Sequence, residues 1–166
     1  MRIMFVCTGN ICRSPLAHRV FEQQVRKRGL ENQFEVESSG IDHWHIGENA
    51  DSRMRRVAKE HGVLLHHRAR QITASDIEEY DVIFAMSAGH LRSIRSMAPG
   101  SAHDLEGRLF LFRQFDPEVA GATLPPDVPD PYYGGTNGFE EVFQIVERTC
   151  EAILDEIEAG RLPLSA

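Results

Sequence analysis

The apolar pattern at the start of the chain predicts a buried strand that leads into a turn. Residues 3–6 (Ile-Met-Phe-Val) are all apolar, without the polar alternation of a half-exposed strand, and Cys7 follows them directly. Gly9 and Asn10 then mark a turn. Cys7 is therefore expected at the carboxyl end of the first strand, next to this turn.

A helix is predicted directly after the turn. Ser14 is expected to be its N-cap, with Pro15 at the first helical position, because a serine side chain can bind the free N–H groups there and proline needs no N–H bond. Gly29 is expected to end this helix. The side chains of its buried stripe are Leu16, Val20, Phe21 and Val25.

The rest of the chain alternates strands with helices. Strands are predicted at residues 34–38, 81–86 and 109–112, and helices at about 52–61, around 91–97 and at about 138–159. A loop rich in proline and acidic residues covers 116–131. This alternation indicates one α/β domain over residues 1–166, with a parallel sheet covered by helices on both faces. Ligands bind outside the carboxyl ends of such strands, and Cys7 lies at the first of them.

Composition and charge narrow the function classes. The chain has 166 residues, of which 42% are hydrophobic and 26% charged, values that are ordinary for a globular protein. The formal net charge of −7 argues against nucleic acid or an anionic membrane as the main partner. We find neither an apolar run of about 20 residues nor a signal-peptide pattern. Three cysteines do not make a disulfide framework, so we expect a protein of the reducing cytoplasm. A monomer is the simplest expectation for its oligomeric state.

The segment from Cys7 to Ser14 (C-T-G-N-I-C-R-S) carries the candidate chemistry. It places a cysteine and Arg13 six positions apart, between a strand and a helix N-terminus. Loop amides and the partial positive charge of the helix can cradle a tetrahedral oxyanion, and the planar guanidinium of Arg13 can bind two of its oxygens. The same surroundings, with the Ser14 hydroxyl, favour the thiolate form of a cysteine. The simpler alternative for Cys7 is a small buried side chain.

The segment V-C-T-G-N-I-C-R-S-P-L-A, which begins at Val6, resembles the signature of the low-molecular-weight protein tyrosine phosphatases. Ser38-Ser39-Gly40, Arg70-Gln71-Ile72-Thr73 and Asp130-Pro131-Tyr132-Tyr133-Gly134 also match, in order, so that the resemblance covers almost the whole chain. It implies a doubly wound, four-stranded parallel sheet in the order 2-1-3-4. It also implies hydrolysis of phosphotyrosine and small aryl phosphates through a cysteinyl-phosphate intermediate, without a metal or cofactor. The partner would be a tyrosine-phosphorylated protein, and phosphate and other oxyanions would be inhibitors.

The resemblance implies a role for each residue that matches a family motif. Cys7 is the expected nucleophile, Arg13 binds the phosphoryl group and stabilises its transition-state charge, and Asp130 is the general acid and then the base. Asp127 competes for the acid role but lacks the Pro-Tyr-Tyr sequence that follows Asp130. The expected phosphate-binding loop consists of Thr8, Gly9, Asn10, Ile11, Cys12, Arg13 and Ser14.

The resemblance also implies supports for this loop and walls for the substrate. Asn10 is expected to tie the loop to Ser38 and His67, and it can at the same time be a left-handed turn residue. Trp44 and Tyr132 are candidates for aromatic walls, which would favour phenyl over alkyl phosphates. For Trp44, a partly buried surface aromatic is the alternative.

Three further features leave alternatives open. Cys12 is either a small buried side chain or a resolving thiol that forms a disulfide with oxidised Cys7. Many relatives have Asp-x-x-Asn after the third strand, whereas this chain has Ser87 and His90, which puts the polar support from that pair in doubt. The basic residues of the second helix form a solvated face or attract acidic phosphopeptides, and they are Arg53, Arg55, Arg56 and Lys59.

Three other functions compete with phosphatase activity. A thioredoxin-coupled arsenate reductase has the same fold and a similar loop, but it needs further cysteines at a place where residues 86–90 hold none. A non-catalytic phosphotyrosine-binding module is expected to lack Cys7 or Asp130, and both are present. A structural metal site would need a second ligand pair beside Cys7 and Cys12, and the sequence offers none.

Overall fold

One four-stranded parallel sheet, with the strands in the order β2-β1-β3-β4, forms the centre of the computed structural model, which describes residues 1–100, 102–133 and 136–162. The strands are β1 (Arg2–Cys7), β2 (Glu35–Gly40), β3 (Val82–Ala85) and β4 (Leu109–Leu111). The α-helices are α1 (Arg13–Lys27), α2 (Ser52–Glu60), α3 (Ala74–Glu79), α4 (Ala88–Met97) and α5 (Thr136–Glu158). The predicted α/β class and the strand order 2-1-3-4 are confirmed. Gly134, the end of one quoted motif, lies outside the described residues.

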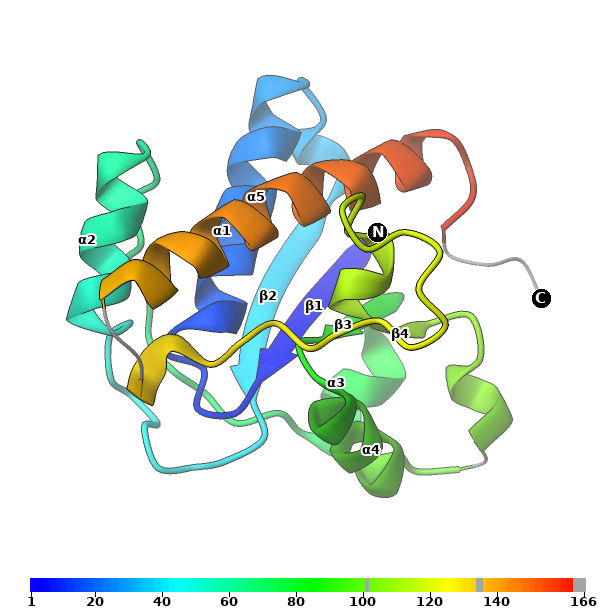
Figure 1. The fold of residues 1–166 in the computed structure, drawn as a ribbon. Coiled ribbons are helices and arrows are strands. Elements are labelled where there is room, and N and C mark those ends of the chain that lie inside the picture. Colours follow the sequence, from blue (N-terminus) through cyan, green and yellow to red (C-terminus); the bar gives the residue numbers. More distant parts are fainter. Residues whose placement is uncertain (101, 134–135, 163–166) are drawn as a thin grey trace.

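Helices cover both faces of the sheet, and Figure 1 shows α1, α2 and α5 on one side and α3 and α4 on the other. The central strand β1 contributes side chains to the apolar clusters on both faces of the sheet, because successive side chains of a strand point to opposite faces. Ile3 and Phe5 belong to the apolar cluster under α1 and α5, whereas Met4 and Val6 belong to the cluster under α3 and α4. The carboxyl end of β1, at Cys7, therefore lies at the centre of the sheet edge.

The start of α1 differs from the sequence prediction. The helix begins at Arg13 and its N-cap is Cys12, which makes no side-chain capping bond, so Ser14 is not the N-cap and Pro15 is not the first helical residue. The physical reason is that the Ser14 hydroxyl is already bound, because Asn10 Nδ2 donates to Ser14 Oγ at 2.8 Å. A short polar side chain that bonds within a loop is not available for capping.

The sequence pattern does not predict α3, which has six residues and is too short for a periodic apolar stripe. Its signal lies at the N-terminus instead. Thr73 and Asp76 form a capping box, in which each side chain binds the backbone N–H of the other residue. The same Asp76 carboxylate accepts a hydrogen bond from Arg70 Nη1 at 2.7 Å, which joins α3 to the segment before it.

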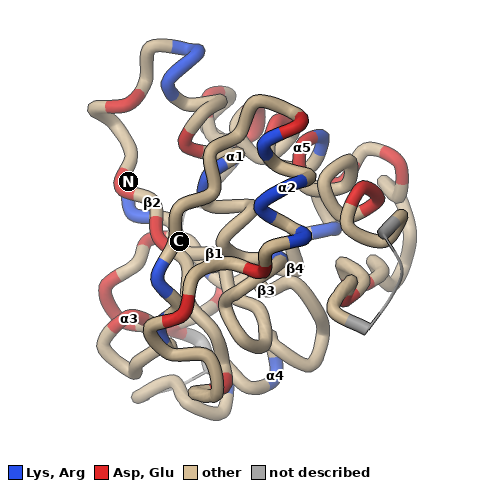
Figure 2. Tube along the Cα trace, turned by 90° about the vertical axis from the view of Figure 1, so that its left-hand side faces the viewer, with Lys and Arg blue, Asp and Glu red and all other residues tan. Residues whose placement is uncertain are grey.

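Basic residues are frequent along α2. Figure 2 shows Lys and Arg segments along α2, where Arg55 and Arg56 are exposed and Arg53 Nη2 lies 2.9 Å from Asp51 Oδ2. Asp51 is the N-cap of α2, and its side chain accepts the backbone N–H of Arg53.

In the described part of the chain, no helix combines the length and the apolar character that a membrane crossing requires.

Asp116 connects the segment after β4 to α5. Its side chain is fully buried and accepts hydrogen bonds from Arg148 Nε at 2.8 Å, Arg148 Nη2 at 3.0 Å and Arg113 Nε at 3.0 Å. Burial alone would raise the pKa of this carboxyl, but the bonds from Arg148, the Glu118 backbone N–H and Arg113 outweigh burial and hold the pKa below its usual value. The carboxylate form thus stabilises the folded chain.

We expect Asp116→Asn to lower the free energy of unfolding at neutral pH by about 2 kcal/mol, less than for a fully buried pair because Arg148 is partly exposed. A depressed folded-state pKa stabilises the fold above the unfolded pKa, and this stabilisation is lost as pH falls through the folded pKa. Urea unfolding of variant and wild type should therefore converge in acid. Glu118→Gln, which removes an exposed partner of the same Arg148, should cost less than about 1 kcal/mol. Parallel pH curves would show that another group is responsible.

Candidate active site

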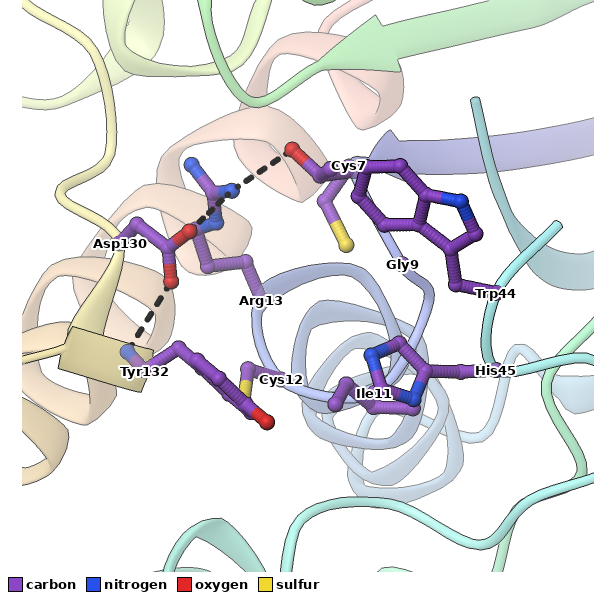
Figure 3. Close-up of a pocket in the computed structure, with 10 residues that line it drawn as sticks. Cys7, Gly9, Ile11, Cys12, Arg13, Trp44, His45, Asp130 and Tyr132 are labelled. Atoms are coloured by element: carbon purple, nitrogen blue, oxygen red, sulfur yellow. Dashed lines mark hydrogen bonds and ion pairs between the residues drawn. The ribbon is translucent and has the colours of Figure 1, made fainter. Parts of the chain in front are cut away.

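Cys7 ends β1 beside the loop that leads into α1. Its side chain is 2% exposed, and Figure 3 shows the sulfur directed into a pocket among residues from distant parts of the chain. Cys7 Sγ lies 3.0 Å from Ser14 Oγ. The first-turn N–H groups of α1, a helix of 15 residues, lie beside the same loop. The sulfur therefore has a hydroxyl and the positive end of a helix next to it.

Asn10 holds the loop in shape through contacts with three residues that are distant in the sequence. Its φ of 59° is the left-handed conformation that asparagine tolerates better than most residues. Asn10 Nδ2 donates to Ser38 Oγ at 3.1 Å, and Asn10 Oδ1 accepts the backbone N–H of Arg70 at 2.9 Å. His67 Nε2 lies 2.9 Å from both the backbone oxygen and Oδ1 of Asn10. The contacts expected between Asn10, Ser38 and His67 are thus present, together with the Arg70 bond that the sequence does not indicate.

His67 donates in this network because both of its partners on Asn10 are acceptors. Burial, followed by the charge of His18, lowers the pKa of His67 to about 4, so its ring is neutral near neutral pH. A neutral ring with its proton on Nε2 can make this bond without introducing a charge. His18, which the sequence analysis did not single out, contacts the same Ser38 hydroxyl through Nδ1 at 3.4 Å.

Gly40 lets the end of β2 approach this loop closely. A Cβ atom at this position would lie 2.8 Å from Thr8 O and 3.0 Å from Asn10 N, both of them backbone atoms. The backbone of Gly40 is fixed on its other side, where its N–H donates to Arg70 O at 2.9 Å. The Ser-Ser-Gly sequence therefore has a steric reason at its third position, since a side chain there would push the loop away.

Arg13 extends its guanidinium along one side of the pocket. It is 6% exposed, and Nη1 donates to Val128 O at 3.1 Å while Nη2 donates to Thr8 Oγ1 at 3.2 Å. Nη2 also lies 3.4 Å from Asp130 Oδ2. Figure 3 marks this ion pair with a dashed line. The Nε of Arg13 is buried and has no hydrogen-bond partner among the described residues. This unused donor on a fixed positive side chain is suited to an anion.

Asp130 and Asp127, the two candidates for a proton donor, have different surroundings. Asp130 lines the pocket, and its Oδ1 accepts the backbone N–H of Tyr132 at 3.0 Å. Asp127 Oδ1 accepts the backbone N–H of Ala88 at 2.9 Å, at the start of α4, and Asp127 is not among the lining residues. The geometry therefore favours Asp130 over Asp127 for chemistry in the pocket.

Aromatic side chains flank the pocket, which has about 440 Å³ of empty space including its open mouth. Trp44 is 72% exposed and Tyr132 is 38% exposed, and Figure 3 shows them with Cys7 between them. Most of the Trp44 side chain is exposed, so it is less buried than the alternative of a partly buried surface aromatic supposes. The His45 ring packs so close to the loop that a Cβ at Gly9 would lie 2.9 Å from His45 Cδ2. Cys7, Thr8, Gly9, Ile11, Cys12, Arg13, Trp44, His45, Asp130 and Tyr132 line the pocket.

The two residues that depart from the sequence signature both make polar contacts. Ser87 is the N-cap of α4 and accepts the backbone N–H of His90 at 3.1 Å. His90 Nε2 lies 2.7 Å from Thr8 Oγ1, so His90 contacts the loop directly and Ser87 contacts the backbone of His90. The sequence named His90 only as a departure and carried no signal for this contact, which joins residues 82 positions apart. In the part of the chain that is described, no group of three or more His, Cys, Asp or Glu side chains could hold a metal ion.

Comparison with known proteins identifies the family. The model of the low molecular weight phosphotyrosine protein phosphatases matches residues 2–161. The chain is 47% identical over 153 residues to a low molecular weight protein-tyrosine-phosphatase of Streptomyces coelicolor, covering 92% of this chain and 91% of that protein. The crystal structure of a protein tyrosine phosphatase from Entamoeba histolytica has a TM-score of 0.88 at 34% identity and covers 98% of this chain and 99% of its own.

An arginine phosphatase from Drosophila has the same fold, with a TM-score of 0.84 at 29% identity, and the match covers 95% of this chain and 98% of that one. Relatives of this architecture are therefore named for more than one kind of phosphorylated residue. The family model and the Streptomyces relative both cover more than nine-tenths of the chain, and both are named for phosphotyrosine or tyrosine. The chain belongs to the low molecular weight phosphotyrosine protein phosphatases, which are hydrolases.

Proposed function

We propose that this chain hydrolyses phosphotyrosine in proteins, and small aryl phosphates, through a cysteinyl-phosphate intermediate and without a metal. The observation that carries the proposal is that Cys7, Arg13 and Asp130 line one pocket, with a guanidinium of Arg13 whose buried Nε has no hydrogen-bond partner among the described residues. Tyrosine-phosphorylated proteins are then the substrates, and inorganic phosphate and similar oxyanions are competitive inhibitors that occupy the same loop.

In the first step, the Cys7 thiolate attacks phosphorus as the bond from phosphorus to the phenolic oxygen breaks. Ser14 Oγ, 3.0 Å from the sulfur, donates to the thiolate. Arg13 and the loop amides bind the phosphoryl oxygens, on which negative charge is spread in the transition state. Asp130 gives its proton to the departing phenolate, which leaves as a neutral phenol.

In the second step, a water molecule attacks phosphorus through its oxygen atom, and the Asp130 carboxylate takes a proton from this water. The bond between sulfur and phosphorus breaks, and inorganic phosphate leaves. Cys7 returns as a thiolate and Asp130 is protonated again, so both groups are restored for another cycle. No electron acceptor is needed, because the reaction is a transfer of one phosphoryl group to water.

The side chains that wall the pocket favour phosphotyrosine as a substrate over other phosphorylated residues. Ile11, Trp44 and Tyr132 present apolar and aromatic surface, which packs favourably against a phenyl ring. A phosphoserine has a shorter side chain than a phosphotyrosine and no ring that could pack against these walls. A phosphoarginine would place a polar guanidinium against the same apolar surface, which is unfavourable unless its N–H groups are bound.

The test is hydrolysis of p-nitrophenyl phosphate with excess chelator, followed by peptides that carry phosphotyrosine, phosphoserine or phosphoarginine in one sequence. We expect full activity with the chelator and a higher kcat/KM for the phosphotyrosine peptide than for the other two. Loss of activity with the chelator would overturn the metal-free mechanism. A preference for the phosphoarginine peptide would overturn the substrate class but leave the mechanism intact.

Gly40→Ala is expected to lower kcat/KM for p-nitrophenyl phosphate by about 10²-fold, because the new Cβ displaces the loop backbone, and misplacing reacting groups by about 1 Å has an effect of this size. Gly138→Ala is a matched control, since its Cβ would come no closer than 3.8 Å to Pro131. Circular dichroism would establish that both variants are folded. Normal activity of folded Gly40→Ala would mean that the loop accommodates the methyl group.

Cys12 is proposed as a resolving thiol for Cys7. Both cysteines line the same pocket. Burial, followed by the charge of Asp51, raises the pKa of the Cys12 thiol well above its usual value, so Cys12 stays a thiol and Cys7 is the one that peroxide attacks first. Peroxide would oxidise the Cys7 thiolate to a sulfenic acid, and Cys12 would displace water from it to form a disulfide. Mass spectrometry after mild peroxide should detect a Cys7–Cys12 link that dithiothreitol reverses, and a sulfinic acid on Cys7 without any link would contradict the proposal.

A further inference from the structure

The hydroxyl of Thr8 has two nitrogen atoms within hydrogen-bond distance at the side of the pocket. Arg13 Nη2 donates to Thr8 Oγ1 at 3.2 Å, and His90 Nε2 lies 2.7 Å from the same oxygen. Thr8 lines the pocket, and His90, in the first turn of α4, is 8% exposed. A hydroxyl group has one proton to donate and two positions at which it accepts. How these three positions are used decides what Thr8 can offer to a bound anion.

Arg13 occupies one of the accepting positions, because a guanidinium can only donate. His90 is uncharged near neutral pH, since burial, followed by the nearby charge of Arg13, lowers its pKa to about 4. One ring nitrogen of His90 then carries a proton and the other does not, and which one does must be inferred from the bonding. The two arrangements have opposite consequences for the Thr8 proton.

The other ring nitrogen decides between the two arrangements. His90 Nδ1 is buried and has no hydrogen-bond partner among the described residues. With the proton on Nδ1, a buried N–H donor would have no acceptor, and such orphaned donors are rare in folded proteins. With the proton on Nε2, Nδ1 is only an unused acceptor, which is better tolerated. His90 Nε2–H then donates to Thr8 Oγ1.

We propose that Arg13 and His90 fill both accepting positions of Thr8 Oγ1, so that the single Thr8 proton is directed at a phosphoryl oxygen bound in the pocket. This inference rests on the proposed function and adds to it a side-chain donor beside the loop amides and Arg13. Thr8 is then a catalytic residue that contacts the phosphoryl group, and His90 is a positioning residue that acts through Thr8.

The binding of inorganic phosphate gives the first test. Thr8→Val keeps the shape of the side chain but lacks the hydroxyl. It should weaken phosphate binding about tenfold or more, because a hydrogen bond to a charged group contributes that much to the binding free energy. Thr8→Ser should restore the binding. His90→Phe should also weaken it about tenfold, because the Thr8 proton is then free to turn away from the pocket. His90→Gln retains an N–H donor and should recover most of the affinity.

The sign of the His90→Phe effect separates the two arrangements. If Thr8 donates its proton to His90, removal of the ring nitrogen releases that proton to the pocket, and phosphate binding stays the same or tightens, which would overturn the proposal. The double variant Thr8→Val/His90→Phe should bind phosphate no more weakly than Thr8→Val alone, because His90 acts only through Thr8. Two losses that multiply would also overturn the proposal.

A measurement on the unchanged protein covers the case in which His90→Phe does not fold. Nitrogen-15 NMR distinguishes the two protonation forms of a histidine ring, and we expect the His90 proton on Nε2. A proton on Nδ1 would overturn the proposal whatever the variants do. Failure of the proposed function is a separate outcome: a wild-type protein without phosphotyrosine hydrolysis would refute it, while the phosphate-binding and NMR results would still report on Thr8 and His90.

Discussion

Replacing Cys7 with serine is expected to lower the hydrolysis of p-nitrophenyl phosphate by at least about 10⁴-fold, because a serine hydroxyl has no adjacent base and is a far weaker nucleophile than a thiolate. Cys7 Sγ lies 3.0 Å from Ser14 Oγ, and among the described residues no hydrogen bond joins Cys7 to a histidine that could activate a serine in its place. The change preserves size and burial, so the fold should survive. Steady-state kinetics measure the loss.

Two controls make this result specific to the sulfur. Cys7→Ser should still bind inorganic phosphate in a calorimetric titration, since the loop amides and Arg13 are unchanged. Cys150→Ala removes a different buried thiol, in α5, where Sγ lies 3.7 Å from Ala17 O, and should leave the rate near that of wild type. Substantial hydrolysis by Cys7→Ser would rule out a cysteinyl-phosphate intermediate.

Replacing Asp130 with asparagine is expected to lower the turnover of phenyl phosphate by about 10²–10⁴-fold, because the phenolate then leaves without a proton. The loss should be smaller for p-nitrophenyl phosphate, whose leaving group is stable as an anion. Comparing the two substrates therefore separates proton donation from a general disturbance of the site, such as loss of the 3.4 Å contact between Asp130 and Arg13 Nη2. Equal losses on both substrates would assign Asp130 to the positioning of Arg13.

Asp127→Asn is the matched control for this prediction. It makes the same chemical change three residues away, at a carboxylate that accepts the backbone N–H of Ala88 and does not line the pocket. We expect kinetics close to wild type on both substrates. A loss at Asp127 that matches the loss at Asp130 would move the acid to the residue that the sequence left as its competitor.

The sequence predicts those features of the fold that depend on local pattern. The apolar run at residues 3–6 and the nearly continuous apolar run at residues 81–86 correspond to β1 and β3, and the alternation of strands and helices predicts the parallel sheet. The start of α1 is wrong because the Ser14 hydroxyl bonds within the loop, and local rules for caps do not include that competition. A bond within the loop thus overrides the local capping preference at the start of α1.

Some residues of the candidate site can likewise be predicted from the sequence, and others cannot. Cys7 and Arg13 lie in one short motif whose chemistry can be recognised from residue types, whereas Asp130 depends on resemblance, because an Asp before Pro is usually a turn residue. The contact between His90 and Thr8 could not be predicted, since it joins residues 82 positions apart through a helix start. The steric role of Gly40 likewise needs coordinates, because only the packing of two backbones reveals it.

The bracing of the loop through Asn10 has a consequence for protein engineering. Its shape is set by Ser38, His67 and the backbone of Arg70, which reach it from 28 to 60 residues away in the chain. A graft of the eight-residue segment onto another strand–helix junction would carry the reactive groups but not their arrangement. A transplant that works must also bring the end of β2 that carries Ser38 and the segment from His67 to Arg70, so the smallest portable unit is much larger than the loop itself.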